Sequence, residues 1–328
     1  MTEEAEKNRA KYADFCGTVY VPLYSKPWWL DAVVGTENWD VWLYEEGGSV
    51  VAAMPYYYEL RRSRKYITKA PLTQNNGIIF KHNENSKYVA KALFEEKVIE
   101  AVCEYIESLG VDVYEQQYQT SFTNWLPFYW NSYTAIPRYT YVIEDTSDLD
   151  AIWENVTSKR RSVIRKGQKN STDLEDLDID TFYNEHEKIY LKQGLKCPFT
   201  YDVWKSLAEA CLKHNSGKIS CRRAPDGNIA SVSFVAWDEK SLYKLMGGPI
   251  PDYAKLDAYG ATTWDEIKLA HELGVSYDFE GSVIKRISKP FREFGAVPKQ
   301  YFRIRKVFNP DIVMEEANLV VKKLKEEE

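Results

Sequence analysis

The two halves of the chain repeat one pattern, and this repeat constrains the fold more than any other feature of the sequence. Three short segments of the first half recur in the second half at nearly the same offset, namely Leu109-Gly110-Val111 as Leu273-Gly274-Val275, Pro127-Phe128 as Pro290-Phe291, and Tyr139-Thr140-Tyr141 as Tyr301-Phe302-Arg303. The offsets are 164, 163 and 162 residues. Offsets this constant over three separate matches indicate two copies of one α/β unit.

Each copy is predicted to contain three strands, a helix, a strand, a helix and a last strand. In the second half, "GKISCRRA" and "NIASVSFVAW" alternate around a turn sequence and predict a hairpin, and "SLYKLMGG" predicts the third strand. The next helix is predicted over 261–274, with Thr263 and Glu266 as a capping box at its start and Gly274 at its end. The strand Val275–Phe279 follows.

The first half predicts the same elements. Residues 39–60 form a hairpin around Gly47-Gly48, and residues 87–110 form an amphipathic helix that ends at Gly110. The predicted fold is therefore α/β (α+β), with two tandem domains that each hold a mixed, mainly antiparallel sheet flanked by helices. We place the first domain at 1–145, the second at 146–308, and a C-terminal helix that packs back at 309–328.

Composition excludes several classes of protein. The 43 basic and 49 acidic residues leave a net charge of −6, which argues against indiscriminate binding to nucleic acid or to an anionic membrane. The five cysteines form no C-x-x-C pair, and the four histidines lack ligand spacing, so neither a disulfide framework nor a metal site is predicted. No apolar stretch approaches the roughly 18 residues of a membrane span. We expect a cytoplasmic protein without membrane insertion.

Two acids lie at the end of the strand Val275–Phe279. Alternation puts Asp278 and Glu280 on one face, and Tyr277 and Phe279 on the other. Two carboxylates on one face suit a general base and an anchor for a substrate amine. The other interpretation is an exposed strand end beside a turn at Gly281-Ser282.

A basic segment, "SKRRSVIRKGQK", opens the second copy. Arg161 and Arg165 recur four positions apart beside Arg160, on one predicted helical face that could clamp phosphates. The alternative is a solvated basic face, because charge runs are often only that.

Two further clusters could bind ligands. Gly260-Ala261-Thr262 follows a strand and leads into a helix, where free N–H groups could hold an anion such as a pyrophosphate. Gln74, Asn75 and Asn76 lie side by side in the first copy, where their amides could face a sugar or peptide. Helix capping and turn capping are the corresponding structural interpretations.

The predicted unit resembles the GNAT acyltransferase fold. Two units in tandem resemble the Fem-type aminoacyltransferases and their relatives, the GNAT-like N-acyltransferases of bacterial envelope metabolism. The most specific stretch runs from Gly247 to Gly295, where "GVSYDFEG" is similar to the family's Tyr-Asp-Phe-x-Gly strand and "PFREFGA" is similar to its Phe-Lys-x-x-Phe-Gly motif. The basic segment also looks like the one that opens the second domain in the family.

This resemblance implies an acyl-transfer cleft in the second copy. Where the family has Phe-Lys near the donor, this chain has Phe291-Arg292, and arginine can hold a phosphate or an oxyanion but cannot shuttle protons. The implied residues are as follows: Asp278, Glu280 and Arg292 for catalysis; Gly247, Gly248, Gly260, Ala261, Thr262 and Phe291 for the donor; and Arg160, Arg161, Arg165, Gln74, Asn75, Asn76 and Tyr259 for an acceptor or its phosphates.

We therefore expect an N-acyltransferase that moves an acyl group from acyl-CoA to an amine of an amino sugar, a nucleotide sugar or a peptide. One alternative is a Fem-like transferase that uses aminoacyl-tRNA on a peptidoglycan precursor. A second alternative is an inactive tandem GNAT protein that only binds a ligand. The first copy lacks a basic residue after Phe128, where Tyr129 follows, and is expected to be a non-catalytic wall for the acceptor.

Overall fold

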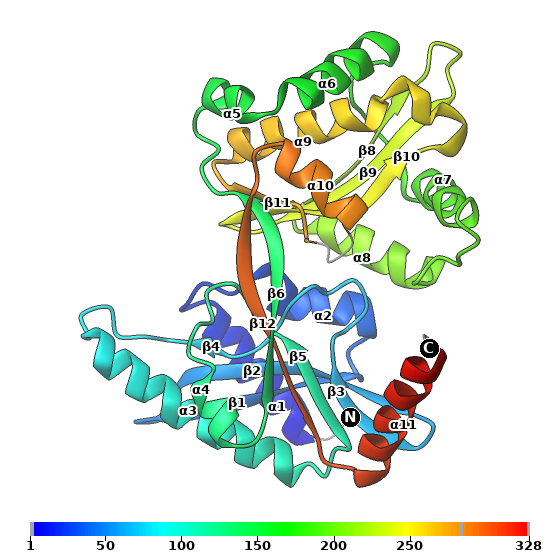
Figure 1. Ribbon diagram of the computed structural model, residues 1–328. Helices are drawn as coiled ribbons and strands as arrows, with labels where there is room; N and C mark the ends of the chain where they lie inside the picture. The colour runs from blue at the N-terminus through cyan, green and yellow to red at the C-terminus, as the bar shows by residue number, and fades with distance from the viewer. Residues whose placement is uncertain (1–2, 282–284, 327–328) are drawn as a thin grey trace. The chain divides into compact units, whose positions relative to one another are not determined.

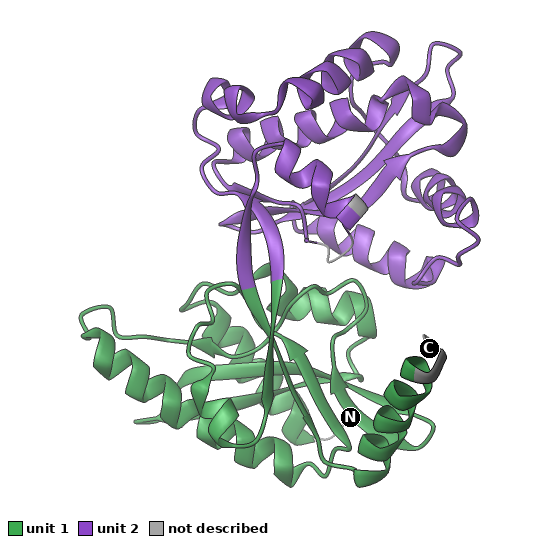
Figure 2. Cartoon of the chain, viewed as in Figure 1, with its two compact units in different colours: residues 1–138, 301–328 green, residues 139–300 purple. Residues whose placement is uncertain are grey.

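The computed structural model describes residues 3–281 and 285–326 and contains two compact units (Figure 2). Unit 1 comprises residues 1–138 and 301–328, and unit 2 comprises residues 139–300. The cuts fall inside β6 (Thr134–Ile143) and β12 (Val297–Val307). Each of these two strands therefore begins in one unit and ends in the other.

Each sequence copy gives its last strand to the other unit. β6 closes the first copy, but it pairs antiparallel with β11 (Ser276–Asp278) of unit 2. β12 closes the second copy and pairs antiparallel with β5 (Val113–Gln117) of unit 1. The predicted boundaries at 145 and 308 mark the duplicated segments, whereas the compact units are divided within strands because strand pairing decides their membership.

Unit 1 contains a sheet with helices packed on it (Figure 1). Its elements before β6 are α1 (Glu3–Cys16), the 3-10 helix η1 (Leu23–Ser25), α2 (Pro27–Val34), β1 (Trp39–Glu46), β2 (Ser49–Arg61), β3 (Arg64–Thr68), β4 (Ile79–Phe80), α3 (Tyr88–Ser108), β5 and α4 (Leu126–Trp130). The C-terminal helix α11 (Pro310–Glu326) also belongs to this unit.

Unit 2 begins with four helices and a short strand and then repeats the order of strands and helices seen from β1 onward in unit 1. Its elements are α5 (Leu149–Asn155), α6 (Ser158–Asn170), β7 (Glu175–Asp176), α7 (Ile179–Leu191), α8 (Tyr201–Lys213), β8 (Gly217–Arg223), β9 (Ile229–Trp237), β10 (Ser241–Pro249), the 3-10 helix η2 (Pro251–Leu256), α9 (Ala258–Leu273), β11 and α10 (Lys285–Glu293). The predicted α/β fold class is confirmed, but the strands of both units follow one continuous path in a single mixed, mainly antiparallel sheet, because β12 lies between β5 and β6.

The duplicated Leu-Gly-Val segments end corresponding helices. Gly110 follows α3 with φ of 58°, and Gly274 follows α9 with φ of 67°. Both values lie in the left-handed region, where a helix commonly stops and glycine carries no Cβ penalty. In both copies the chain then turns into the strand that pairs in parallel with the third strand of its unit, β5 with β3 and β11 with β10.

The predicted capping box at Thr263 and Glu266 is wrong. α9 begins earlier, at Ala258, after Asp257 in the left-handed conformation with φ of 62°. Thr263 and Glu266 therefore lie inside the helix and are buried. The Thr-x-x-Glu pattern did not predict the helix start because the Glu266 carboxylate accepts hydrogen bonds from side chains on three strands. It does not accept a hydrogen bond from the backbone at a helix start.

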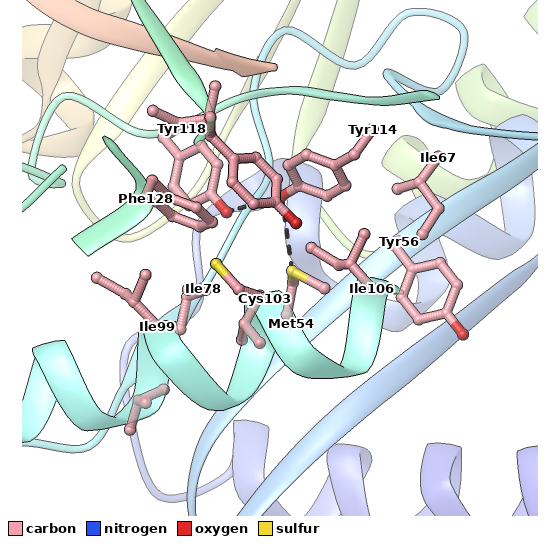
Figure 3. Packing of buried hydrophobic residues seen from close by; sticks show 14 of the residues in the cluster. Met54, Tyr56, Ile67, Ile78, Ile99, Cys103, Ile106, Tyr114, Tyr118 and Phe128 are labelled. Atoms are coloured by element: carbon pink, nitrogen blue, oxygen red, sulfur yellow. Dashed lines mark hydrogen bonds between the residues drawn. The ribbon is translucent and has the colours of Figure 1, made fainter. Parts of the chain in front are cut away.

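The core of unit 1 lies between α3 and the sheet (Figure 3). Ile99, Cys103 and Ile106 of α3 face buried side chains of the strands, including Met54 and Tyr114. The Tyr114 hydroxyl lies 2.7 Å from that of Tyr118. Pairing satisfies these two polar groups inside an apolar core, where an unpaired hydroxyl would be costly.

Helices cover both faces of the unit 2 sheet. Phe234 and Val235 are neighbours on β9 and therefore point to opposite faces. Phe234 contacts Phe182 of α7 and Trp204 of α8, whereas Val235 belongs to the cluster that includes Ile267 of α9. Over residues 3–281 and 285–326, no helix combines the length and apolar character needed to cross a membrane.

Candidate active site

Strands β10 and β11 of unit 2 pair over a short distance and then separate. Ser241–Tyr243 pairs in parallel with Ser276–Asp278, but β10 continues to Pro249. Its other edge stays paired with β9 as far as Pro249. From Lys244 onward, none of the described strands pairs with the edge of β10 that faces β11. The backbone groups there can bind an extended ligand, as exposed sheet edges do.

A β-bulge lies at the point where the two strands separate. Lys244 is the register partner of Val235 and Met246 that of Phe234, so Leu245 is an extra residue on β10. A bulge bends its strand and increases its twist, which directs β10 away from β11.

Gly247 allows β10 to stay close to β9 after the bulge. It has φ of 143°, and a Cβ at this position would lie 2.4 Å from the carbonyl oxygen of Val232. Gly248 is less constrained, because its Cβ would meet only the end of the Ile189 side chain of α7, at 3.0 Å. Two of the predicted donor-site glycines, Gly247 and Gly248, thus lie on the free part of β10, and each packs closely against a neighbour there.

We expect Gly247→Ala to lower the free energy of unfolding by about 2–4 kcal/mol, because the new Cβ clashes with backbone and the backbone conformation is strained. Gly248→Ala is the matched control and should cost less than about 1 kcal/mol, since the flexible Ile189 side chain can move. Urea denaturation of both variants measures the difference. Equal effects would contradict the assigned close approach at Gly247.

Asp278 is the last residue of β11 and lies at the point where β10 separates from β11. It is the register partner of Tyr243, one residue before the free edge of β10. Its Oδ1 accepts hydrogen bonds from the Thr140 hydroxyl and from the Glu280 N–H, the latter at 2.8 Å. Burial raises the pKa of Asp278 to about 6, although both hydrogen bonds act to lower it. A carboxylate with this pKa can accept a proton near neutral pH.

The predicted alternation around Asp278 is present. Tyr277 and Phe279 are buried, whereas Asp278 and Glu280 are partly exposed. The strand ends at Asp278, however, and Glu280 lies in the left-handed region with φ of 62°. A Cβ at Gly281 would lie 2.3 Å from the Tyr139 carbonyl oxygen, so this turn presses against β6 and orients Asp278. Ser282, the other residue of the predicted turn, lies outside the described residues.

A buried ionic network lies behind the free edge of β10, and sequence reasoning missed it. Lys244 of β10 and Glu266 of α9 are 8% and 2% exposed, and the Lys244 Nζ donates to Glu266 Oε2 at 2.6 Å. Glu266 also accepts from the hydroxyls of Ser233 on β9 and Tyr277 on β11. One carboxylate therefore links α9 to three adjacent strands. A lysine in the apolar strand "SLYKLMGG" was the available signal.

Tyr259 and Thr263 complete this network on the α9 side. The Lys244 Nζ donates to Thr263 Oγ1 at 3.0 Å and lies 4.3 Å from the ring centroid of Tyr259. Burial acts to lower the pKa of Lys244, but Glu266 and Tyr259 raise it above its ordinary value. Lys244 is thus a charged structural group beside the bulge. The predicted acceptor residue Tyr259 contacts this lysine.

Phe291 and Arg292 lie on α10 and differ in their surroundings. The Phe291 ring packs against Phe279 at 4.7 Å and Tyr141 at 5.9 Å between centroids, which anchors α10 to the strands. The Arg292 side chain is exposed, and its guanidinium forms no hydrogen bond or ion pair with another described residue. Its guanidinium is available to an anion, although no contact links it to Asp278.

The arginines of the basic segment on α6 are used mainly within unit 2. Arg160 pairs with Glu293 at 2.5 Å, and both side chains are largely buried. Arg161 donates to the carbonyl oxygens of Trp153 and Glu154 at the end of α5. Arg165 is exposed and stacks over Trp153 at 5.4 Å. These contacts tie α6 to α5 and α10, and they engage the Arg160 and Arg161 guanidinium groups within unit 2 rather than leaving them on a solvated basic face.

Gly260 and Ala261 are buried where α9 packs against α6, whereas the buried Thr262 hydroxyl lies 2.8 Å from that of Ser231 on β9. A Cβ at Gly260 would lie 2.7 Å from Val163 Cγ1, and one at Gly167 of α6 would lie 2.4 Å from the Asp257 carbonyl oxygen. The small residues therefore permit close helix packing. This packing covers them, which argues against a pyrophosphate on Gly260 and Ala261 themselves.

The amide cluster of the first copy lies in unit 1. Asn76 is buried, and its Oδ1 accepts from the Ser25 hydroxyl and the Gly77 N–H, each at 2.8 Å. The backbone N–H of Asn76 donates to the Gln117 carbonyl oxygen at 2.7 Å, so this segment lies beside the end of β5. Asn76 thus has a structural role, whereas Gln74 and Asn75 are partly exposed.

No thiol in the described part of the chain is activated. All five cysteines are free, and burial raises the pKa of each, to about 11 for Cys16 and about 12 for Cys103 and Cys221. A raised pKa leaves little thiolate at neutral pH. Among the same residues, no three His, Cys, Asp or Glu side chains are grouped so that they could hold a metal ion.

Comparison with known proteins defines the class. Residues 154–283, most of unit 2, match the family model of the acetyltransferase (GNAT) domain. No curated protein matches the sequence. Unit 2 is therefore similar to the GNAT acetyltransferase domain over these residues.

Solved structures extend the likeness to the whole chain. FemX superposes with a TM-score of 0.66 at 11% identity, covering 96% of this chain and 98% of FemX. The C-terminal domain of a putative lysylphosphatidylglycerol synthetase from Agrobacterium fabrum gives 0.54 at 11%, covering 97% and 96%. A tandem GNAT protein from the clavulanic acid biosynthesis pathway gives 0.52 at 9%, covering 94% and 97%. The chain has the tandem GNAT fold of these Fem-like structures.

Proposed function

We propose that unit 2 transfers an acyl group from an acyl-CoA thioester to the amine of a small acceptor. The observation that carries this proposal is the free edge of β10, which begins next to the residue paired with Asp278. An extended donor arm can hydrogen-bond along that edge, as a strand added to a sheet would. Its thioester then lies near a carboxylate whose pKa is about 6.

The chemical step needs a base and a group that stabilises negative charge. Asp278, directly or through one water, accepts a proton from the acceptor ammonium, and the neutral amine attacks the thioester carbonyl carbon. The N–C bond forms, the C–S bond breaks, and the departing thiolate takes up the proton that the attacking nitrogen loses. Backbone N–H groups of β10 near Gly247 and Gly248 would stabilise the developing oxyanion. The raised pKa values of the cysteines favour direct attack over a cysteine-bound intermediate.

In this proposal unit 1 is non-catalytic and has an acceptor-binding role. By the duplication, the end of β5 in unit 1 corresponds to the end of β11 in unit 2. The position beside β11 is open, whereas the position beside β5 is occupied by the segment that contains Asn76, whose backbone N–H donates to the Gln117 carbonyl oxygen. Gly77 also packs against the ring of Tyr118, since a Cβ there would lie 2.6 Å from that ring. At the offset of 164 residues of the Leu-Gly-Val repeat, Tyr114 of unit 1 corresponds to Asp278 of unit 2, so unit 1 has no carboxylate at this position.

The acceptor in this proposal is an amino sugar, a nucleotide sugar or a peptide of bacterial envelope metabolism. Arg292 and Arg165 remain exposed and could bind its phosphates. The Fem-like fold favours a second candidate, in which the donor is aminoacyl-tRNA and the acceptor a peptidoglycan precursor. The net charge of −6 and the internal contacts of Arg160 and Arg161 make a broad tRNA surface a weaker fit.

Thermal unfolding with coenzyme A, acetyl-CoA and longer acyl-CoAs tests the donor. A ligand at 100 times its dissociation constant stabilises the native state by about 2.7 kcal/mol, so we expect a rise in Tm of several degrees that depends on acyl chain length. A rise at millimolar ligand would then justify a screen of amine acceptors. If no acyl-CoA shifts Tm and salt-sensitive tRNA binding appears, the aminoacyl-tRNA candidate replaces this one.

An inactive ligand-binding protein is the third candidate. It predicts no turnover in the acceptor screen and ligand binding that Asp278→Asn leaves unchanged. Loss of turnover with an unchanged acyl-CoA shift would exclude it.

A further inference from the structure

The outward face of α11 carries an apolar surface without a described partner. Val313, Met314, Val320, Val321 and Leu324 are each about half exposed or more. Ala317 lies among them and is exposed. Exposed apolar patches of this kind mark interaction sites on soluble proteins.

α11 is attached to unit 1 by its other side. Ile312 is buried, and Glu315 and Glu316 form ion pairs with Arg64 and Arg305 of unit 1. These three contacts orient the helix so that its apolar side points away from the unit. The apolar residues therefore do not contribute to the core of unit 1.

The spacing of the apolar residues is that of a helix that pairs with another helix. Residues 313, 317, 320 and 324 are separated by four, three and four positions, which is the a/d pattern of a coiled coil. Met314 and Val321 lie beside this seam on one edge, and Glu316 and Lys323 lie on the other edge. Charges beside such a seam select the partner and its direction.

We propose that α11 pairs in antiparallel orientation with α11 of a second copy of this chain. In such a two-fold pair, the Glu316 of one helix lies against the Lys323 of the other, and the same pairing repeats on the opposite end. A parallel pair would instead place these charges against the apolar edge of Met314 and Val321. The sequence of the helix is therefore complementary to itself only in the antiparallel arrangement.

An anionic membrane is a poorer partner for this face. Membrane-surface helices flank their apolar face with several lysines or arginines. Here the flanking pair is one acid and one base, and the whole chain carries a net charge of −6. Electrostatic attraction to anionic lipids is thus lacking.

The helix pair alone is small. A helix of 17 residues is about 26 Å long. A contact of that length buries less than the roughly 1,200–2,000 Å² of a standard interface. We therefore expect a dimer with a dissociation constant in the micromolar range or weaker.

Sedimentation velocity of the full chain between roughly 5 and 500 μM tests this proposal. We expect a reversible monomer–dimer equilibrium that Val320→Glu shifts to monomer by at least about 30-fold in the dissociation constant. Leu319→Glu is the matched control, because Leu319 is 59% exposed against 58% for Val320 but lies off the apolar face. It should dimerise like the unchanged protein.

Charge reversal tests the antiparallel direction. Glu316→Lys and Lys323→Glu should each weaken the dimer severalfold, and the two together should restore it. Arg305 keeps its ion pair with Glu115 when Glu316 is replaced, so the helix attachment is not lost entirely.

Four outcomes would overturn the proposal. The first is a protein that stays monomeric at every concentration, and the second is equal disruption of the dimer by Val320→Glu and Leu319→Glu. The third is a monomeric protein whose Tm is lowered by Val320→Glu. The fourth is flotation of the monomer with phosphatidylcholine/phosphatidylglycerol vesicles. The third outcome would show that the face is covered within one chain, and the fourth that it contacts lipid.

Discussion

Replacement of Lys244 by methionine is expected to lower the free energy of unfolding of unit 2 by about 3–5 kcal/mol, because it leaves Glu266 charged and buried without its cation. Glu266 is 2% exposed, and the Lys244 ammonium is the cation that hydrogen-bonds to it, at 2.6 Å. The hydroxyls of Ser233 and Tyr277 still donate to it but bring no charge. Urea denaturation at pH 7 measures the loss.

The double variant Lys244→Met with Glu266→Gln separates the charge from the packing. A glutamine keeps acceptors for the two hydroxyls and removes the buried charge, so the double variant should be more stable than Lys244→Met alone. Such non-additivity is the signature of a coupled pair. If Lys244→Met costs less than about 1 kcal/mol, the charged pair does not stabilise the fold in the way described here.

Replacement of Asp278 by asparagine is expected to reduce acyl transfer by about 10²–10⁴-fold, the usual contribution of a general base. Asparagine keeps the acceptor for Thr140 and for the Glu280 N–H, so the turn should persist while the proton acceptor is lost. Glu280→Gln is the matched control, and it decides which of the two predicted acids is the base. A larger loss with Glu280→Gln would reverse the assignment.

The pH dependence of transfer follows from the same carboxyl. Burial raises the pKa of Asp278 to about 6. In the proposed mechanism the ionised form is the base, so the transfer rate of the unchanged protein should rise as pH increases through about 6. Thr140→Val removes a hydrogen bond that lowers this pKa and should move the rise to higher pH. A profile that is flat between pH 5 and 8 would contradict Asp278 as the base.

Stability should change in the opposite direction to activity. The pKa of Asp278 in the folded protein is above its ordinary value of 3.8, so ionisation of this carboxyl destabilises the fold, and the destabilisation is complete once pH exceeds about 6. Asp278→Asn should therefore stabilise unit 2 at pH 8 by on the order of 1–2 kcal/mol, and by little at pH 4. Thermal unfolding at both values measures this, and an equal change at both would exclude ionisation as its cause.

Local patterns in the sequence determined the order of the elements. The three hairpin strands, the two helices that end at Gly110 and Gly274, and the alternation of Tyr277, Asp278 and Phe279 follow from turn chemistry and side-chain period alone. The recurrence of these patterns at an offset of about 164 residues also determined that the unit is present twice. These features need only neighbouring residues and could therefore be predicted.

Only the tertiary structure decided which strands pair and which charges are free. The exchange of β6 and β12 between the units depends on hydrogen bonds between segments that are far apart in the chain. Arg160 and Arg161 look like a phosphate clamp in sequence, but Arg160 forms an ion pair with Glu293 and Arg161 donates to carbonyl oxygens at the end of α5. Lys244 and Glu266 look like ordinary charges, yet burial makes them one ion pair behind the bulge of β10. Local sequence determines backbone preference, whereas burial and partnership are properties of the packed chain, and they decided where an active site could lie.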